Sequence, residues 1–297
     1  MKKKVSLVLS GGGARGIAHI GVIEELEKEG FDIFSVSGTS MGALIGGVYA
    51  LGKMEACKNW LFTLDKIKVF NLVDFTLSTQ GLVKGDKVLN KMKYFIPDAN
   101  IEDLPIFYTA VAADIINKEE VAFTRGSVFE AIRASMAIPT VFTPVKTETG
   151  LLVDGGVLNN IPVNHALRRP DDLLVVVNVN ADIPVERPKS SKRELEEKHS
   201  VYQKKIREFY GQLQKINPLS SPGESIGYFN LITKTLSLMT YHMSQMALER
   251  YSPDILINIS RDSCGTYDFF KAEELVVIGR LAAKKSLGNY YNSLKER

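Results

Sequence analysis

The 297-residue sequence predicts an α/β fold with a mostly parallel central sheet. Two apolar, β-rich segments, residues 5–9 and 33–37, each end in a glycine-rich turn that leads into a helical pattern. A third apolar run, residues 173–179, has the continuous character of a strand that is buried on both faces. Strand, helix, strand and helix within about fifty residues form a βαβ unit, in which the strands are parallel.

The rest of the chain contains further helical and strand patterns. Apolar residues at helical spacing across 17–26 predict a helix that ends at Gly30, and the small residues 43–51 predict a second helix. Further strands are expected at residues 106–115, 120–124, 151–153 and 255–259. Further helices are expected at residues 129–136, before Pro139, and at residues 273–287.

Composition divides the chain into three parts. Residues 1–185 contain the glycine-rich turns and are expected to form the core of the α/β domain, which residues 251–297 complete with a strand and a helix. Residues 186–250 begin as a charged loop and continue as amphipathic helices, which serve as a lid, an interface or a cover of the core. The methionine-rich stripe within residues 225–250 favours a packed core or dimer helix over a membrane-surface element, because methionine packs well in interiors.

Charge and composition limit the classes of partner. A formal charge of +3 is too small to indicate nucleic acid, and 45% apolar residues are sufficient for a sizeable core. Cys57 and Cys264 give no disulfide framework and no zinc pattern, so a cytoplasmic protein without a metal is expected. No run of about 20 apolar residues predicts a membrane span. Peripheral contact with the inner face of the membrane and a homodimer remain open.

The first chemical motif is the turn that contains Ser40. Gly38 and Gly42 flank this serine in a G-x-S-x-G pattern between a predicted strand and a predicted helix. Such a turn lifts the serine hydroxyl above the strand ends, and side chains in place of the two glycines would collide with neighbouring chain or block substrate. The amino terminus of the following helix favours negative charge beside the serine. This context favours a nucleophile over a plain tight turn.

The second motif is the glycine-rich turn from Gly11 to Gly16. Successive backbone amides at Gly11, Gly12 and Gly13 could form a nest for an anion, which in an acyl hydrolase is the oxyanion of the tetrahedral intermediate. Loss of one such donor typically costs about 3 kcal/mol of barrier. Arg15 either adds a fixed positive charge or anchors the loop through a salt bridge. We therefore expect an oxyanion hole that comprises Gly11, Gly12, Gly13, Arg15 and Gly16.

The same turn also matches the G-x-G-x-x-G pattern of dinucleotide-binding folds. Asp32 lies sixteen residues after Gly16, loosely where a ribose-binding acid could fall. Such an acid should lie at the end of the second strand, whereas Asp32 precedes this strand. An NAD(P)-binding oxidoreductase is therefore kept only as an alternative, which NAD(P) binding would distinguish.

A serine nucleophile needs a base, and Asp154 is the best candidate. Asp154 leaves a predicted strand directly into the glycines Gly155 and Gly156, whereas none of the four histidines has such a place. An Asp-Gly pair alone is typical of an ordinary turn, and only the other two motifs favour a catalytic base. Because a free aspartate has a pKa of about 3.9, burial must raise the pKa, or turnover should be modest.

Together these segments resemble the patatin-like phospholipase family. Three motifs carry the resemblance, at residues 11–16, 38–42 and 154–156, and residues 134–139, 142–145 and 159–162 also look like the family. The aspartate motif ends in Gly-Gly, where many members have Gly-Ala. The resemblance covers roughly residues 5 to 180, and the last third of the chain is similar to bacterial members only loosely.

The resemblance implies a three-layer α/β/α sandwich and an enzyme that hydrolyses acyl esters. It implies a Ser–Asp dyad without histidine, in which Ser40 is the nucleophile and Asp154 the base, and an oxyanion hole in the first glycine turn. The implied substrates are phospholipids, lysophospholipids and related acyl esters, and no cofactor is expected. Because the sequence has no evident cluster of metal ligands, activity should survive EDTA. A regulatory protein that retains the fold with little catalysis is the second alternative.

Overall fold

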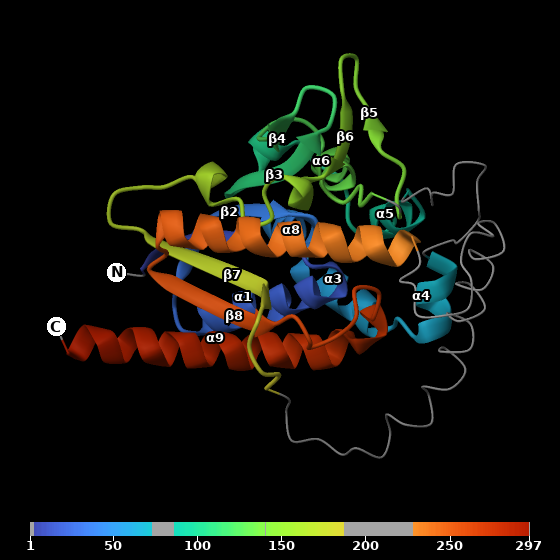
Figure 1. The fold of residues 1–297 in the computed structure, drawn as a ribbon. Coiled ribbons are helices and arrows are strands. Elements are labelled where there is room, and N and C mark those ends of the chain that lie inside the picture. The colour runs from blue at the N-terminus through green and yellow to red at the C-terminus, as the bar shows by residue number, and fades with distance from the viewer. Residues whose placement is uncertain (1–2, 73–85, 140, 187–227, 297) are drawn as a thin grey trace.

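The computed structural model describes residues 3–72, 86–139, 141–186 and 228–296, which form one eight-stranded sheet with helices on both faces (Figure 1). The strand order is β5-β6-β3-β2-β1-β7-β8, and β4 also pairs with β3. β1, β2, β3, β7 and β8 are parallel, whereas β4, β5 and β6 are antiparallel to their neighbours. The strands are β1 (Lys4–Leu9), β2 (Asp32–Thr39), β3 (Phe107–Asp114), β4 (Glu119–Phe123), β5 (Val145–Lys146), β6 (Leu151–Asp154), β7 (Leu173–Ala181) and β8 (Ile255–Ser260).

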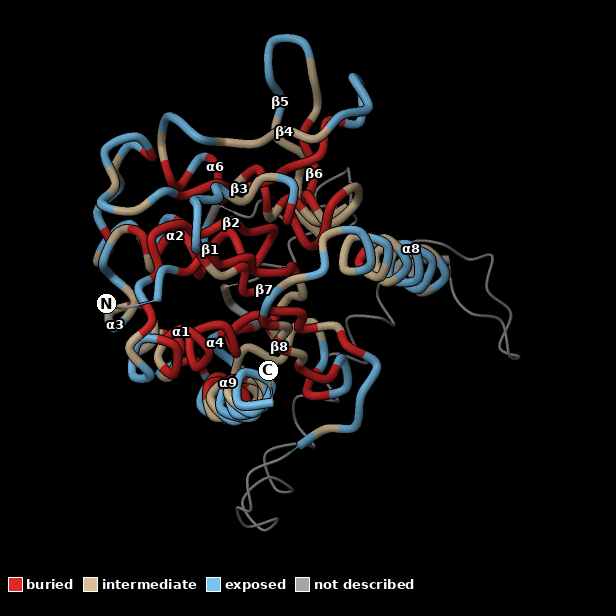
Figure 2. The backbone as a smooth tube through the Cα atoms, turned by 90° about the vertical axis from the view of Figure 1, so that its left-hand side faces the viewer, coloured by how far each residue is buried: buried red, intermediate tan, exposed pale blue. Residues whose placement is uncertain are grey.

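Helices cover the two faces of the sheet unequally. Figure 2 shows α1, α2 and α9 on one side of the sheet and α8 on the other, which confirms the sandwich of helix, sheet and helix layers. The described α-helices are α1 (Ala18–Lys28), α2 (Met41–Ala50), α3 (Met54–Phe62), α4 (Lys66–Leu72), α5 (Asp86–Lys93), α6 (Val128–Ser135), α8 (Tyr228–Tyr251) and α9 (Ala272–Lys295). The short 3-10 turns are η1 (Gly13–Ile17), η2 (Ile101–Asp103), η3 (Gly155–Val157), η4 (Val163–His165) and η5 (Phe269–Lys271).

The central strands bury side chains on both faces. On β1, Val5, Leu7 and Leu9 belong to the main core with α1, α2 and α9, whereas Val8 packs with Ile161 in a second cluster on the other face. Successive side chains of a strand point to opposite faces, so a strand covered on both sides needs apolar residues at nearly every position. This requirement explains the continuous apolar run from which the strand at residues 173–179 was predicted.

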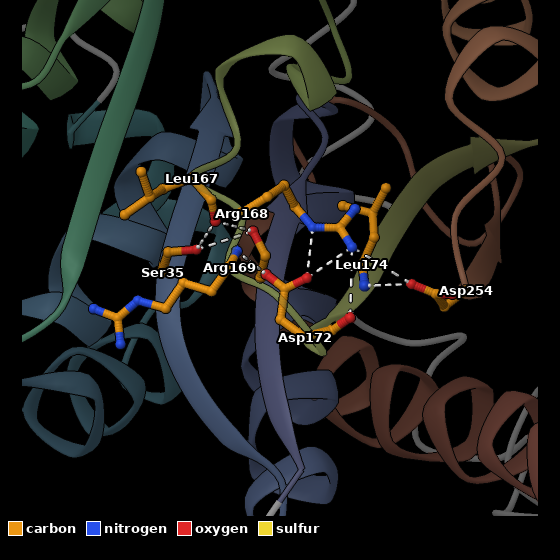
Figure 3. A network of polar contacts seen from close by, with 8 residues as sticks. Ser35, Leu167, Arg168, Arg169, Asp172, Leu174 and Asp254 are labelled. Carbon is orange, nitrogen blue, oxygen red and sulfur yellow. Dashed lines mark hydrogen bonds and ion pairs between the residues drawn. The ribbon is translucent and has the colours of Figure 1, made fainter.

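The chain between β6 and β7 crosses the second face of the sheet and is held there by hydroxyl groups. Three β2 side chains at alternate positions donate hydrogen bonds to carbonyl oxygens of this segment. The pairs are Thr39 with Asn159, Ser37 with His165 and Ser35 with Leu167, at 2.8, 2.8 and 3.0 Å. Further along, Arg168 Nε donates to Asp172 Oδ1 at 2.7 Å (Figure 3). The segment between β6 and β7 is therefore hydrogen-bonded to β2 at residues 159, 165 and 167.

α8 is a surface helix with one packed face. Leu248 packs against the second core cluster and Ser244 is buried, while Leu238 and Met246 are 58% and 68% exposed. The stripe expected to be a core or dimer helix is thus only partly covered within the described residues. The charged loop expected before this helix, residues 187–227, lies outside them. None of the helices that are described is long and apolar enough to cross a bilayer.

Candidate active site

Ser40 and Asp154 meet where β2 ends. Ser40 Oγ donates a hydrogen bond of 2.5 Å to Asp154 Oδ2, although the two residues are 114 positions apart. Both residues are buried, with exposed fractions of 4% and 7%. The two glycine-flanked turns that were singled out in the sequence are therefore brought into direct contact.

Strand pairing explains this contact. β4 pairs with one edge of β3, along residues 110–114. β2 and β6 therefore both pair with the other edge, β2 along residues 107–111 and β6 along residues 112–114. Thr39, the last residue of β2, pairs with Val111, and Asp154, the last residue of β6, pairs with the next position, Ala112. Because β6 is antiparallel to β3, its end approaches the end of β2 head-on. The sequence did not indicate this direction of β6.

The turn around Ser40 is as sharp as the G-x-S-x-G pattern predicts. Ser40 has φ 55° and ψ −122°, in a region that non-glycine residues rarely adopt. A Cβ atom on Gly38 would lie 2.4 Å from the Gly42 carbonyl, and one on Gly42 would lie 2.2 Å from Leu9 O. Both flanking glycines are thus required by close approach of backbone, as the sequence predicted.

The surroundings of Asp154 make it a stronger base than a free aspartate. Burial raises the pKa of its carboxyl group to about 6, while hydrogen bonds from Ser40 and from the Gly156 amide act in the opposite direction. The Gly156 amide donates to Oδ1 at 2.8 Å, which leaves Oδ2 directed at Ser40. Gly155 lies so close to β3 that a Cβ atom would be 2.2 Å from Val111 O. Burial thus shifts this pKa in the direction that a catalytic base would need.

The glycine-rich turn corrects one expectation. The Gly11 amide donates to Asn160 O at 3.1 Å, so it is not available for an oxyanion. Within the described part of the chain, the amides of Gly12 and Gly13 make no such bond, and Gly13 lines the same cavity as Ser40. The candidate oxyanion donors in this turn are therefore Gly12 and Gly13.

Arg15 and Gly16 have structural positions in the same turn. Arg15 donates to Asn180 Oδ1 at 3.0 Å and to Cys264 O at 3.4 Å, while Asn180 Nδ2 donates to Gly11 O at 2.7 Å. Arg15 therefore anchors the loop through neutral acceptors, where the sequence suggested a salt bridge. A Cβ atom on Gly16 would lie 2.3 Å from the Met41 side chain, so this glycine lets the turn pack against the residue after Ser40.

The described histidines lie elsewhere. His19 is fully buried, and its Nε2 atom lies 2.8 Å from Ser10 O. Burial lowers the pKa of His19 to about 4. His165 Nε2 lies 2.6 Å from Glu120 Oε2, and His242 stacks edge-on with a tyrosine. None of these three contacts Ser40 or Asp154, and His199 lies outside the described residues. The Glu120 contact was not anticipated from the sequence.

An apolar cavity extends from Ser40 between the helices on its side of the sheet. Its wall is almost entirely hydrocarbon, and among the described residues that line it Arg133 alone is charged. The wall includes Leu44, Leu61, Leu64, Leu89, Met92 and Met136. α3, α4 and α5 supply much of this wall, and the sequence did not predict these three helices. Such a cavity suits a hydrocarbon chain attached to the group that reaches Ser40.

The dinucleotide alternative finds little support in the geometry. Asp32 is the first residue of β2 and is exposed, at the end of the sheet opposite the glycine-rich turn. A ribose-binding acid belongs at the carboxyl end of that strand, where Thr39 and Ser40 stand. Among residues 3–72, 86–139, 141–186 and 228–296, no group of three or more His, Cys, Asp or Glu side chains is placed to hold a metal ion.

Comparison with known proteins agrees with the resemblance seen in the motifs. Residues 7–167 match the family described as Patatin-like phospholipase. An uncharacterized NTE family protein of Mycobacterium tuberculosis is 30% identical over 96% of this chain and 91% of its own length. The chain belongs to the patatin-like phospholipase family, and its relatives over nearly the whole length are NTE family proteins. This membership places it among lipid hydrolases.

More distant relatives are larger. A lysophospholipase NTE1 of Pyricularia oryzae is 27% identical over 93% of this chain, and one of Aspergillus niger is 29% identical over 99%. The chain spans 18% of the length of each of these two proteins. Among solved structures, VipD from Legionella pneumophila is 15% identical, with a TM-score of 0.47, and the match covers 97% of this chain and 67% of VipD.

Proposed function

We propose that this protein is a serine acyl hydrolase that cleaves fatty-acyl ester bonds of phospholipids, lysophospholipids or related lipids through a Ser40–Asp154 dyad. The observation that carries this proposal is the 2.5 Å hydrogen bond from Ser40 Oγ to Asp154 Oδ2 beside an apolar cavity. The names of the fungal relatives favour a lysophospholipid among these substrates.

In the first half of the reaction, Ser40 Oγ forms a bond to the acyl carbonyl carbon while Asp154 accepts the hydroxyl proton. The carbonyl oxygen becomes an oxyanion, for which the amides of Gly12 and Gly13 are the proposed donors. The bond to the alcohol then breaks, and the proton passes from Asp154 to the departing oxygen. The acyl chain remains on Ser40 and extends into the apolar cavity.

In the second half, a water molecule attacks the acyl carbon and gives a proton to Asp154. The bond between the acyl carbon and Ser40 Oγ breaks, and the proton returns to Ser40 as the fatty acid leaves. Asp154 thus acts as acid and as base in turn, which a carboxyl group with a pKa of about 6 can do near neutral pH.

Reaction with a fluorophosphonate probe, followed by mass spectrometry of the peptides, tests the nucleophile directly. Modification of Ser40 is expected. Ser40→Ala and Asp154→Asn should each remove hydrolysis of a lysophospholipid without unfolding the protein, whereas Asp32→Asn, at the far end of β2, should keep wild-type activity. Full activity in either dyad variant would falsify the assignment, and NAD(P) binding that is lost in Asp32→Asn would favour the oxidoreductase instead.

A further inference from the structure

One family-like motif, residues 134–139, has no role in the reaction as proposed. It contains Ser135, the last residue of α6, which is fully buried. The Ser135 hydroxyl makes two hydrogen bonds: it accepts one from the Ser40 amide at 2.8 Å and donates one to Val111 O at 2.6 Å. This single side chain therefore links the backbone of Ser40 to β3.

The Ser40 amide belongs to a residue with an unfavourable backbone conformation. A non-glycine residue at φ 55° and ψ −122° persists only where its surroundings hold it in place. Ser135 supplies the hydrogen-bond acceptor for that buried amide, and loss of the acceptor would leave a buried donor unsatisfied. The backbone of Ser40 would then relax towards more favourable φ and ψ angles, and this change would move Ser40 Oγ away from its place beside Asp154.

The residues that follow Ser135 contact Asp154 and the apolar cavity. The Asp154 amide donates to Ala137 O at 2.9 Å, so residues 135 and 137 each hold one member of the dyad by its main chain. Met136 and Ile138, at the alternate positions, line the apolar cavity. Four consecutive residues thus contact the nucleophile, the base and the cavity wall.

We propose that Ser135 is a positioning residue, whose hydroxyl holds the strained backbone of Ser40 on β3 so that Ser40 Oγ faces Asp154. This inference rests on the proposed function, because it takes Ser40 to be the nucleophile. Ser135 acts only through the main chain of Ser40 and does not touch the substrate.

The same helix offers a matched control. Ser127 caps the amino terminus of α6: its Oγ accepts from the Glu130 amide at 3.0 Å and donates to Asp98 Oδ2 at 2.6 Å. Ser127→Ala, like Ser135→Ala, removes two hydrogen bonds of one serine on α6, but it leaves the dyad untouched. A merely structural role for Ser135 predicts that the two variants behave alike.

The experiment compares kcat and KM on a chromogenic acyl ester, the rate at which a fluorophosphonate modifies Ser40, and the thermal midpoint. Ser135→Ala should lower both kcat and the modification rate roughly 10- to 100-fold with KM unchanged, since small displacements of a reacting atom have effects of this size. Both variants should have lower thermal midpoints, but Ser127→Ala should keep both rates within about twofold of wild type.

Ser135→Cys serves if the alanine variant does not fold, because a thiol fills the same site but is a weaker acceptor. It should also slow Ser40 modification, by less than alanine does. Wild-type rates in Ser135→Ala or Ser135→Cys, or an equal loss in Ser127→Ala, would overturn the inference. If Ser40→Ala is inactive in the same assay, such a result leaves the proposed dyad standing, whereas activity in Ser40→Ala removes both.

Discussion

As the proposed base, Asp154 should determine how activity depends on pH. The dyad needs an ionised carboxylate, and burial raises the pKa of this group to about 6. We therefore expect kcat/KM to increase about tenfold per pH unit below this pKa and to level off above it. The measurement is a pH series with a neutral chromogenic ester. A profile that rises only above pH 8 would assign the base to another group.

Burial of the same carboxylate should also appear in the stability of the protein. In the window between about 3.9, the pKa of the unfolded chain, and about 6 in the folded state, the folded protein holds the proton more tightly. The contribution of Asp154 is thus fully present at low pH and is lost as pH rises through 6, by about 3 kcal/mol in total.

Asp154→Asn removes this titration. Relative to wild type, the variant should gain free energy of unfolding as pH increases from 4 to 7, measured by urea denaturation at each pH. The gain arises because an amide carries no charge to desolvate. A difference between variant and wild type that stays constant across this range would show that the Asp154 carboxyl group has the same pKa in the folded and unfolded states.

At the scale of elements, the contact between α1 and α9 depends on two glycines. A Cβ atom on Gly279 would lie 2.0 Å from Ala18 O, and one on Gly21 would lie 1.9 Å from Val276 O. The two helix backbones therefore touch without side chains between them, and this close approach brings α9 onto the sheet beside β8.

Gly279→Ala should lower the free energy of unfolding by about 2 kcal/mol or more, because the added methyl group forces the two helices apart. Gly288→Ala is the control on the same helix: nothing lies within 4 Å of its Cβ position, so it should raise stability by about 0.5–1 kcal/mol through helix propensity. Denaturant titrations of both variants give the comparison. Equal shifts in the two would contradict the close approach.

At the scale of the whole molecule, the cavity beside Ser40 is built from helices that span residues 41 to 135 of the sequence. α2, α3, α5 and α6 all contribute to its wall. A single apolar cavity of this kind should make the enzyme sensitive to acyl chain length, since each methylene group contributes separately to binding.

Leu89→Trp on α5 places a larger side chain in that wall. We expect it to reduce kcat/KM roughly tenfold for a palmitoyl ester while a butyryl ester is hydrolysed as by wild type. Ile67→Trp, on the exposed side of α4, is the matched control and should change neither rate. If both esters lose activity in proportion in Leu89→Trp, the substituted side chain has disturbed the dyad and the cavity does not hold the acyl chain.

Local patterns were sufficient for much of the fold. The strands predicted at residues 5–9, 33–37, 173–179 and 255–259 all lie within observed strands, because burial on both faces makes most of their positions apolar. α3, α4 and α5 escaped prediction, because they are only 9, 7 and 8 residues long and give too few turns for a clear periodic pattern. The domain boundaries at 185 and 250, membrane contact and a homodimer stay predictions.

The motifs alone located both turns that meet at the site, since the glycines lie directly beside Ser40 and Asp154 or within two residues of them in the sequence. Only the tertiary structure decided that Ser40 Oγ and Asp154 Oδ2 lie 2.5 Å apart, that the Gly11 amide is already bonded, and that the Ser40 amide donates to Ser135 Oγ. The contact between Ser40 and Asp154 depends on the edge of β3 with which β6 pairs and on the direction of β6. The packing of the whole sheet determines which strands pair across more than a hundred residues, and local sequence patterns do not predict this pairing.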